Sequence, residues 1–194
     1  MKTSLMPQNR GGVASAVVTV WVVFMVGFLW TDTCLGKTAR EIDVSVDVAL
    51  ERFYKQVKGG KEFGENTKGM LVMPGVKKAA FIVGGEYGEG ALKVGGKTVG
   101  YYNLVSGSFG LQIGAQAKDI IIAFMTTEAL KRFRASQGWQ AGVDGNITFV
   151  DVGGGQQLDT RTLKSDIVGF VFDSKGIIAD ISLKGAKFTK LDKK

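Results

Sequence analysis

The chain has 194 residues and a net charge of +7 at neutral pH, with 25 Lys and Arg against 18 Asp and Glu. It contains no histidine and one cysteine, which excludes Cys/His zinc sites, Ser-His-Asp and Cys-His catalytic machinery, and an internal disulfide. The positive charge suits an anionic partner, and it suits the solubility of a small domain equally well.

The first 36 residues differ in character from the rest. Two basic residues precede an uncharged apolar run over residues 13–30. This run is long for a signal peptide and short for a membrane-spanning helix, so its length leaves cleavage and anchoring open. The small residues Cys34 and Gly36 favour cleavage after Gly36, with an uncleaved anchor or lipidation at Cys34 as alternatives. In each case residues 37–194 are expected to cross the membrane.

Residues 37–194 carry a net charge of +6 and are long enough for one domain. The spacing of Thr38 and Glu41 is that of a capping box, which predicts a helix start. Apolar residues then recur at helical spacing until Gly59 and Gly60 end the helix; they are Ile42, Val46, Ala49, Leu50, Phe53 and Val57. This stripe predicts packing on a sheet, and the alternative is an amphipathic face that contacts lipid.

A glycine-punctuated region follows, with twelve of the 28 glycines between Gly69 and Gly114. Short strands are expected over residues 70–73, 79–84, 91–94, 98–104, 109–113, 120–125, 143–150, 166–172, 177–183 and 187–191, with one helix from Thr126 or Thr127 to about Ser136. Gly95-Gly96 predicts a hairpin turn. Short connections indicate a mainly antiparallel sheet, and the glycines indicate strong curvature. The predicted fold is therefore α+β, with a strongly curved or barrel-like sheet and two or three helices.

The sequence GGEYGEG over residues 84–90 has the glycine content of a phosphate loop. The spacing is wrong for dinucleotide binding and a strand follows it, so we interpret it as a turn and bulge between two strands. Carboxylate pairs for acid–base chemistry are formally available, as are Ser106 and Ser108 as nucleophiles; the pairs are Glu86 with Glu89 and Asp144 with Asp151. Surface or turn roles explain all of them, and we expect no enzyme, no cofactor and no metal.

Basic residues gather in several places. One group lies near the end of the first helix (Lys55, Lys58, Lys61), one is a pair expected in a turn (Lys77, Lys78), and others are Lys131, Arg132 and Arg134, and Lys184, Lys187, Lys190, Lys193 and Lys194. Singly, each is typical of a solvated face. Near an anionic membrane each contributes about 1 kcal/mol, so several on one surface give salt-sensitive attachment. No nucleic-acid-binding pattern is present.

Several separated segments, in order, resemble the SYLF domain family. They are KGMLVMPGVKKAAFIVGGEYGEG (residues 68–90), YYNLVSGSFGLQIGAQ (101–116), DIIIAFMTTEALKRF (119–133), WQAGVDGNITF (139–149) and the stretch 167–185. The chain departs from the family in three places. It lacks the usual Trp and Pro in residues 98–103, has Asp173-Ser174 where the family has a Tyr-Ser pair, and has Asp180 for a glycine. The resemblance implies a non-catalytic lipid-binding module, which in eukaryotes associates with actin.

Residues and resemblance together predict a non-enzymatic phospholipid-binding protein of the bacterial cell envelope. Residues 1–36 are the signal peptide or anchor, and residues 37–194 are the lipid-binding domain in, or facing, the periplasm. We expect anionic headgroups to contact Lys55, Lys58, Lys61, Lys77 and Lys78. The alternative is an envelope scaffolding protein that binds another protein through a sheet edge or a Tyr101-Tyr102 surface.

Overall fold

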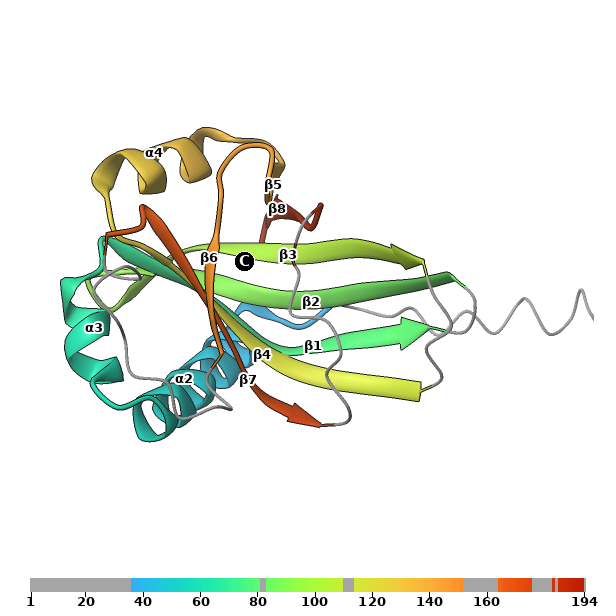
Figure 1. Ribbon diagram of the computed structural model, residues 1–194. Helices are drawn as coiled ribbons and strands as arrows, with labels where there is room; N and C mark the ends of the chain where they lie inside the picture. Colours follow the sequence, from blue (N-terminus) through green and yellow to red (C-terminus); the bar gives the residue numbers. More distant parts are fainter. Residues whose placement is uncertain are drawn as a thin grey trace, which may run out of the picture. The chain divides into compact units, whose positions relative to one another are not determined.

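The computed structural model describes residues 36–80, 83–109, 114–151, 164–175, 183 and 185–193. Residues Lys37–Lys194 form one compact unit. Its described part contains three helices and one eight-stranded, mostly antiparallel sheet that curls into a half-barrel (Figure 1). The predicted α+β class and curved sheet are therefore confirmed.

Two of the three helices begin at the predicted caps. Helix α2 spans Ala39–Gln56, and its capping box is complete: the Thr38 amide donates to Glu41 Oε2 at 2.7 Å, and the Glu41 amide donates to Thr38 Oγ1 at 3.3 Å. Helix α4 spans Thr127–Ala135 behind the cap Thr126. The seven-residue helix α3, Gly60–Asn66, was not predicted separately; it starts after Gly59, which has a φ of 79°.

The strands are β1 Gly69–Ala80, β2 Val83–Val94, β3 Lys97–Phe109, β4 Gly114–Phe124, β5 Trp139–Gln140, β6 Thr148–Asp151, β7 Ile167–Lys175 and β8 Lys187–Leu191. Their order in the sheet is β5-β8-β3-β2-β1-β4-β7-β6. Neighbours pair antiparallel except β6 with β7, which pair parallel. The predicted hairpin turn is present at Gly95 and Gly96, which have φ values of 56° and 77°.

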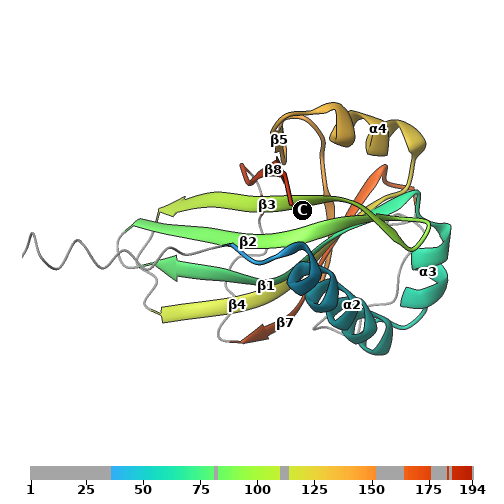
Figure 2. The same cartoon turned by 180° about the vertical axis from the view of Figure 1, so that it is seen from behind.

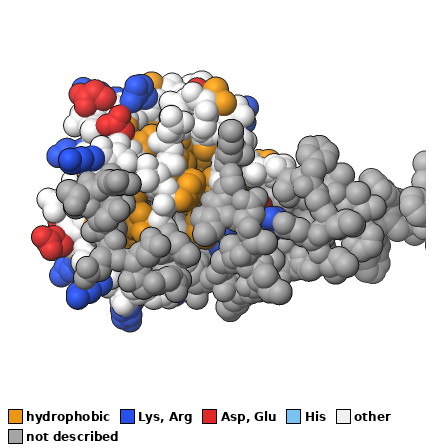
Figure 3. All heavy atoms as spheres, viewed as in Figure 1, with side chains coloured by type: hydrophobic (Ala, Val, Ile, Leu, Met, Phe, Trp, Pro, Cys, Tyr) orange, Lys and Arg blue, Asp and Glu red, His pale blue; other side chains and the backbone are white. Residues whose placement is uncertain are grey.

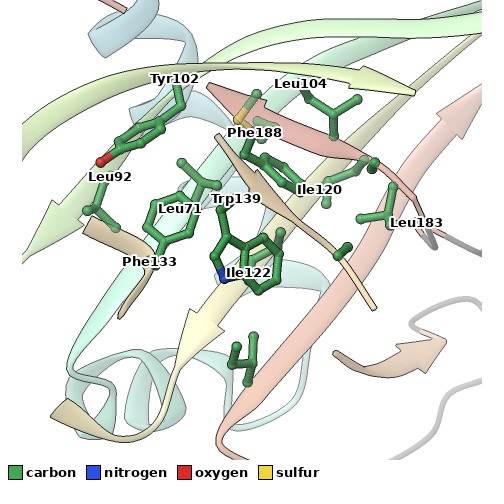
Figure 4. Close-up of a cluster of buried hydrophobic side chains, with 14 of the residues drawn as sticks. Leu71, Leu92, Tyr102, Leu104, Ile120, Ile122, Phe133, Trp139, Leu183 and Phe188 are labelled. Atoms are coloured by element: carbon green, nitrogen blue, oxygen red, sulfur yellow. The ribbon is translucent and has the colours of Figure 1, made fainter. Parts of the chain in front are cut away.

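The sheet has an inner and an outer face, each covered by its own hydrophobic cluster. Alternation along β4 shows this directly, because Ile120 and Ile122 belong to the inner cluster and Ile121 to the outer one. The inner cluster includes Phe133 of α4 and Trp139 of β5, whose side chains converge with those of β1, β2, β3 and β8 (Figure 4). Helix α2 lies across the outer face (Figure 2).

The apolar stripe of α2 is buried in this outer cluster. Ile42, Val46, Ala49 and Phe53 have no exposed surface, and Phe53 stacks edge-on against Phe170 of β7 with ring centroids 4.9 Å apart. Of the two interpretations of the stripe, packing on the sheet is the one the structure shows.

Two expected turns are wrong, because the strands continue through them. Lys77 and Lys78 lie within β1, and residues 84–90 lie within β2. Pro74 and Gly75 do not end β1; the register with β4 shifts between Met73 and Val76, and Gly75 has a φ of 61°. They form a bulge inside a long strand.

The glycines of β2 accommodate that bulge. A Cβ on Gly90 would lie 2.0 Å from the Val72 carbonyl oxygen, and a Cβ on Gly88 would lie 2.7 Å from Val76 Cγ2. Close approach of β1, and not a turn, therefore explains why glycine is needed at these two positions.

The remaining strand predictions divide between the described and undescribed parts of the chain. The strand expected over residues 143–150 is present only as β6, and β5 was not predicted. The strand expected over 177–183 lies almost wholly outside the described residues, as do residues 110–113 and the N-terminal apolar run. Within the described ranges, no helix has the length and apolar character needed to cross a membrane.

Candidate functional site

The structure separates the five lysines that the sequence grouped as lipid contacts. Lys55, Lys58 and Lys61 are exposed at the junction of α2 and α3, where Val57 and Phe63 pack with Met70 at the start of β1. Lys77 lies seven residues after Met70 in β1, a separation of about 23 Å at the rise of an extended strand. The structure does not bring the two groups into one basic patch.

Lys77 and Lys78 also lie on opposite faces of the sheet, because successive residues of a strand alternate. Lys77 is exposed on the outer face. Lys78 is only 8 % exposed on the inner face, and its Nζ lies 3.9 Å from Glu86 Oε1. The two neighbours therefore have different surroundings, one open to solvent and one enclosed beside a carboxylate.

Strand pairing places Lys77 in a row of four side chains across the outer face. Lys77 of β1 is opposite Tyr87 of β2, Tyr87 is opposite Val105 of β3, and Val105 is opposite Lys187 of β8. Tyr87 and Val105 are each 50 % exposed, and both lysines are exposed. We call these four residues the outer row: two apolar side chains in the middle with a lysine at each end.

A buried carboxylate next to the outer row fixes the position of its tyrosine. Tyr87 Oη donates to Glu89 Oε1 at 2.9 Å. Glu89 also accepts from the Lys37 amide at 2.9 Å and from Lys193 Nζ at 3.3 Å, so it joins the first and last parts of the domain. The outer row is therefore connected, through the hydrogen bond of Tyr87 to Glu89, to contacts that join the two ends of the domain.

The outer face towards α2 is occupied by polar links to that helix. Asp43 accepts from Thr98 Oγ1 at 2.8 Å and from Tyr101 Oη at 2.9 Å. Lys93 pairs with Asp47. These contacts hold α2 over β2 and β3, so the open part of the outer face is the end that carries the outer row.

The aromatic surface expected at Tyr101 and Tyr102 is not present. Tyr102 is 4 % exposed within the inner cluster, and this burial raises the pKa of its phenol. Tyr101 is half-buried against the outer cluster and bonded to Asp43. Alternation in β3 puts the two rings on opposite faces, which sequence adjacency alone did not reveal.

The candidate catalytic groups are not assembled either. Glu86 and Glu89 lie on opposite faces, where Glu86 pairs with Lys118 and Glu89 with Lys193. Asp144 accepts from the Gln140 amide at 2.6 Å, while the side chains of Asp151 and Ser108 lie outside the described set. The described residues contain no cluster of three or more potential metal ligands.

Among the described residues, the exposed outer row thus lies on the outer face of a curved sheet. Residues 105–194 match the family model described as Ysc84, Las17-binding protein actin regulator, which is the SYLF family. The SYLF resemblance is confirmed over these residues, which run from late β3 through β8. No curated protein matches the chain.

The SYLF family is a family of binding domains and not of enzymes. Its members bind lipids and, in eukaryotes, associate with actin. Most of the glycine-rich block over residues 68–116 lies before the matched segment, so the outer row combines two residues inside the match, Val105 and Lys187, with two outside it.

Proposed function

We propose that the protein is a non-enzymatic phospholipid-binding protein of the bacterial cell envelope, and that it contacts anionic membrane surfaces through the outer row. The observation that carries the proposal is the register that lines up Lys77, Tyr87, Val105 and Lys187 on an exposed face. The family match supports lipid binding in general, and the exposed lysines at the two ends of the row support a contact with anionic headgroups there.

The chemistry of the row fits the boundary between headgroups and acyl chains. Tyrosine rings favour this boundary because one end is apolar and the other is polar. The apolar stems of Lys77 and Lys187 can lie along it while their ammonium groups reach phosphates. Each lysine near an anionic surface contributes about 1 kcal/mol, and salt screens that attraction.

The junction of α2 and α3 is a second basic region in this proposal. Lys55, Lys58 and Lys61 are exposed there, but acidic Glu51, Glu62 and Glu65 of the same helices are exposed beside them. Mixed charge makes this region the weaker of the two contacts. Lys78, being enclosed, does not contribute to the outer surface.

The envelope location rests on the apolar run over residues 13–30, with basic residues before it. Whether cleaved, retained or lipidated, such a segment directs residues 37–194 across the membrane. We therefore propose a domain that faces the periplasm and meets the outer leaflet of the cytoplasmic membrane or another anionic envelope surface. Fractionation of the expressing cell, with protease digestion of intact spheroplasts, tests this location.

Co-sedimentation with vesicles tests the lipid contact. Residues 37–194, first shown to be folded by circular dichroism, are mixed with vesicles of phosphatidylcholine alone or with added phosphatidylglycerol. We expect binding to the anionic vesicles only, weakened by salt. Lys77→Glu with Lys187→Glu should reduce it strongly, because both ends of the row then repel the headgroups.

The matched control reverses the same number of charges elsewhere. Lys55→Glu with Lys58→Glu makes the same change in net charge at the other end of the outer face and should have the smaller effect. Equal losses in the two double variants would show that net charge, and not the outer row, determines binding.

A further inference from the structure

Three buried charged side chains lie together on the inner face near the Ala80 end of β1. Glu86 of β2 is directly opposite Lys78 of β1, and Lys118 of β4 is opposite Val76 of β1. Lys78 lies two residues after Val76 in β1, and Lys118 lies two residues before Ile120 in β4. Residues two apart in a strand share a face, and both Val76 and Ile120 belong to the inner cluster. We call Lys78, Glu86 and Lys118 the inner triad.

The triad is enclosed and incompletely bonded. The side chains of Lys78, Lys118 and Glu86 are 9 %, 9 % and 6 % exposed. Lys118 Nζ donates to Glu86 Oε1 at 3.0 Å, whereas Lys78 Nζ is 3.9 Å from that oxygen, which is too far for a hydrogen bond. Among the described residues, Glu86 Oε2 is buried without a hydrogen-bond partner.

Its charges are also unbalanced, with two ammonium groups for one carboxylate. Two other carboxylates, which are buried on the outer face, have close partners: Glu89 is bonded to Lys193 and Asp119 to Arg52. A buried charge is stable when it is paired and hydrogen-bonded, and it is unfavourable otherwise. The triad therefore places an ammonium group that makes no hydrogen bond to the carboxylate beside a carboxylate oxygen that has no hydrogen-bond partner.

That combination complements a group that carries both an oxyanion and a hydrogen-bond donor. A phosphate ester with a neighbouring hydroxyl has both, whereas sulfate at neutral pH has acceptor oxygens only. Hydrogen bonds between ionised partners are the stronger ones, so Lys78 would bind the oxyanion while Glu86 Oε2 accepts from the hydroxyl. Lys118 keeps Glu86 in position through its 3.0 Å bond.

We propose that the inner triad is a binding site for a phosphate ester with an adjacent hydroxyl, distinct from the outer row. This chemistry is shared by the phosphoglycerol headgroup of a lipid and by free glycerol phosphate. Binding of a lipid headgroup at this site rests on the proposed function, whereas binding of free glycerol phosphate does not. The two lysines next to each other in β1 would then serve two sites, Lys77 outside and Lys78 inside.

Titration of the full chain in a nonionic detergent tests the site. Calorimetry and thermal unfolding are measured with glycerol 3-phosphate, inorganic phosphate and sulfate. We expect saturable binding of glycerol 3-phosphate that raises the unfolding temperature, and sulfate binding weaker by about tenfold or more, as the loss of one charged hydrogen bond implies. Lys78→Met should abolish the binding, while Lys97→Met, the same charge change at an exposed residue of β3, should leave it intact.

Lys78→Met and a further variant, Glu86→Gln, separate binding from folding and identify the source of the ester. Lys78→Met removes the less well paired of the two buried cations and is expected to fold. Glu86→Gln keeps the size of the side chain and should reduce the preference for glycerol 3-phosphate over sulfate. Loss of phosphatidylglycerol vesicle binding in Lys78→Met would assign the site to the lipid headgroup; retained vesicle binding with lost glycerol phosphate binding would assign it to the free ester.

The absence of saturable glycerol 3-phosphate binding by the unmodified chain would overturn the proposal, and so would unchanged binding in Lys78→Met. Failure of the proposed function is recognised separately. If Lys77→Glu with Lys187→Glu leaves vesicle binding unchanged, the outer row is not a membrane contact, and the glycerol phosphate result still decides the triad.

Discussion

Arg52 of α2 and Asp119 of β4 form an ion pair across the outer face, with 2.6 Å between Arg52 Nη2 and Asp119 Oδ2. The other carboxylate oxygen of Asp119 accepts from the Gly75 amide at 2.8 Å. One carboxylate therefore binds both the helix and the bulge of β1. It links the element that covers one end of the outer face to the strand that carries Lys77.

We expect Asp119→Ala to destabilise the domain by about 2–3 kcal/mol, because it removes two hydrogen bonds to a charged group that is 4 % exposed. Urea unfolding of residues 37–194 measures the change. Glu51→Ala, one residue before Arg52 and exposed, is the control and should change stability by less than about 0.5 kcal/mol. Equal effects of the two substitutions would contradict the structural role given to Asp119.

Gly90→Ala should be among the most damaging single substitutions in β2. Its Cβ would lie 2.0 Å from the Val72 carbonyl oxygen and 2.9 Å from Met73 Cα, and backbone atoms cannot move aside easily. We expect a loss of about 3 kcal/mol or more, measured by thermal or urea unfolding. Gly107→Ala in β3, where no atom lies within 4 Å of the added Cβ, should be close to neutral.

The capping box predicts a specific pH dependence. Hydrogen bonds from the backbone and side chain of Thr38 hold the pKa of Glu41 below its ordinary value. Because this pKa is lower in the folded state, the stabilisation is present above the unfolded pKa and is lost as the pH falls through the folded pKa. The difference in unfolding temperature between the natural domain and Glu41→Gln should therefore disappear in acid. A difference that stays the same as the pH falls through the folded pKa would contradict this role.

Cleavage after Gly36 is expected to change how much Glu89 contributes to stability. The Lys37 nitrogen lies 2.9 Å from Glu89 Oε2, and Lys193 Nζ bonds both Glu89 and the Lys37 carbonyl oxygen. In a chain that starts at Lys37 this nitrogen is an ammonium group, and charge-assisted hydrogen bonds are the stronger kind. Glu89→Gln should therefore cost about 1 kcal/mol more in that chain than in one that keeps residues 31–36. Equal costs in the two chains would show that Glu89 does not respond to the new terminus.

Local signals in the sequence are sufficient for helices α2 and α4 and for the hairpin. Thr38 with Glu41, Thr126, and Gly95-Gly96 each act through their own neighbours, and all are found where expected. Gly88 and Gly90 fall in residues 84–90, for which the sequence predicts a turn and bulge because glycine usually interrupts strands. Their actual role depends on how closely β1 approaches β2, which only the assembled sheet determines.

The candidate site was predictable only in part for the same reason. Lys77 was selected by its charge, but its partners in the outer row come from strands β2, β3 and β8, and pairing register is a non-local property. A predicted strand that includes both Lys77 and Lys78 places the two lysines on opposite faces, because strand side chains alternate. The inner triad likewise needs three strands to meet, so no spacing within the sequence indicates it.

Vesicle binding tests lipid recognition by the outer row most directly. The measurement compares anionic with neutral vesicles, for the natural domain and for the double variant Lys77→Glu with Lys187→Glu. We expect the natural domain to bind phosphatidylglycerol vesicles at about 0.1 M salt, to be largely released at about 1 M, where the Debye length falls to about 3 Å, and to ignore phosphatidylcholine. The double variant should behave on both vesicles as the natural domain does on phosphatidylcholine. Binding that is the same on both lipids, insensitive to salt and unchanged by the two substitutions would contradict it.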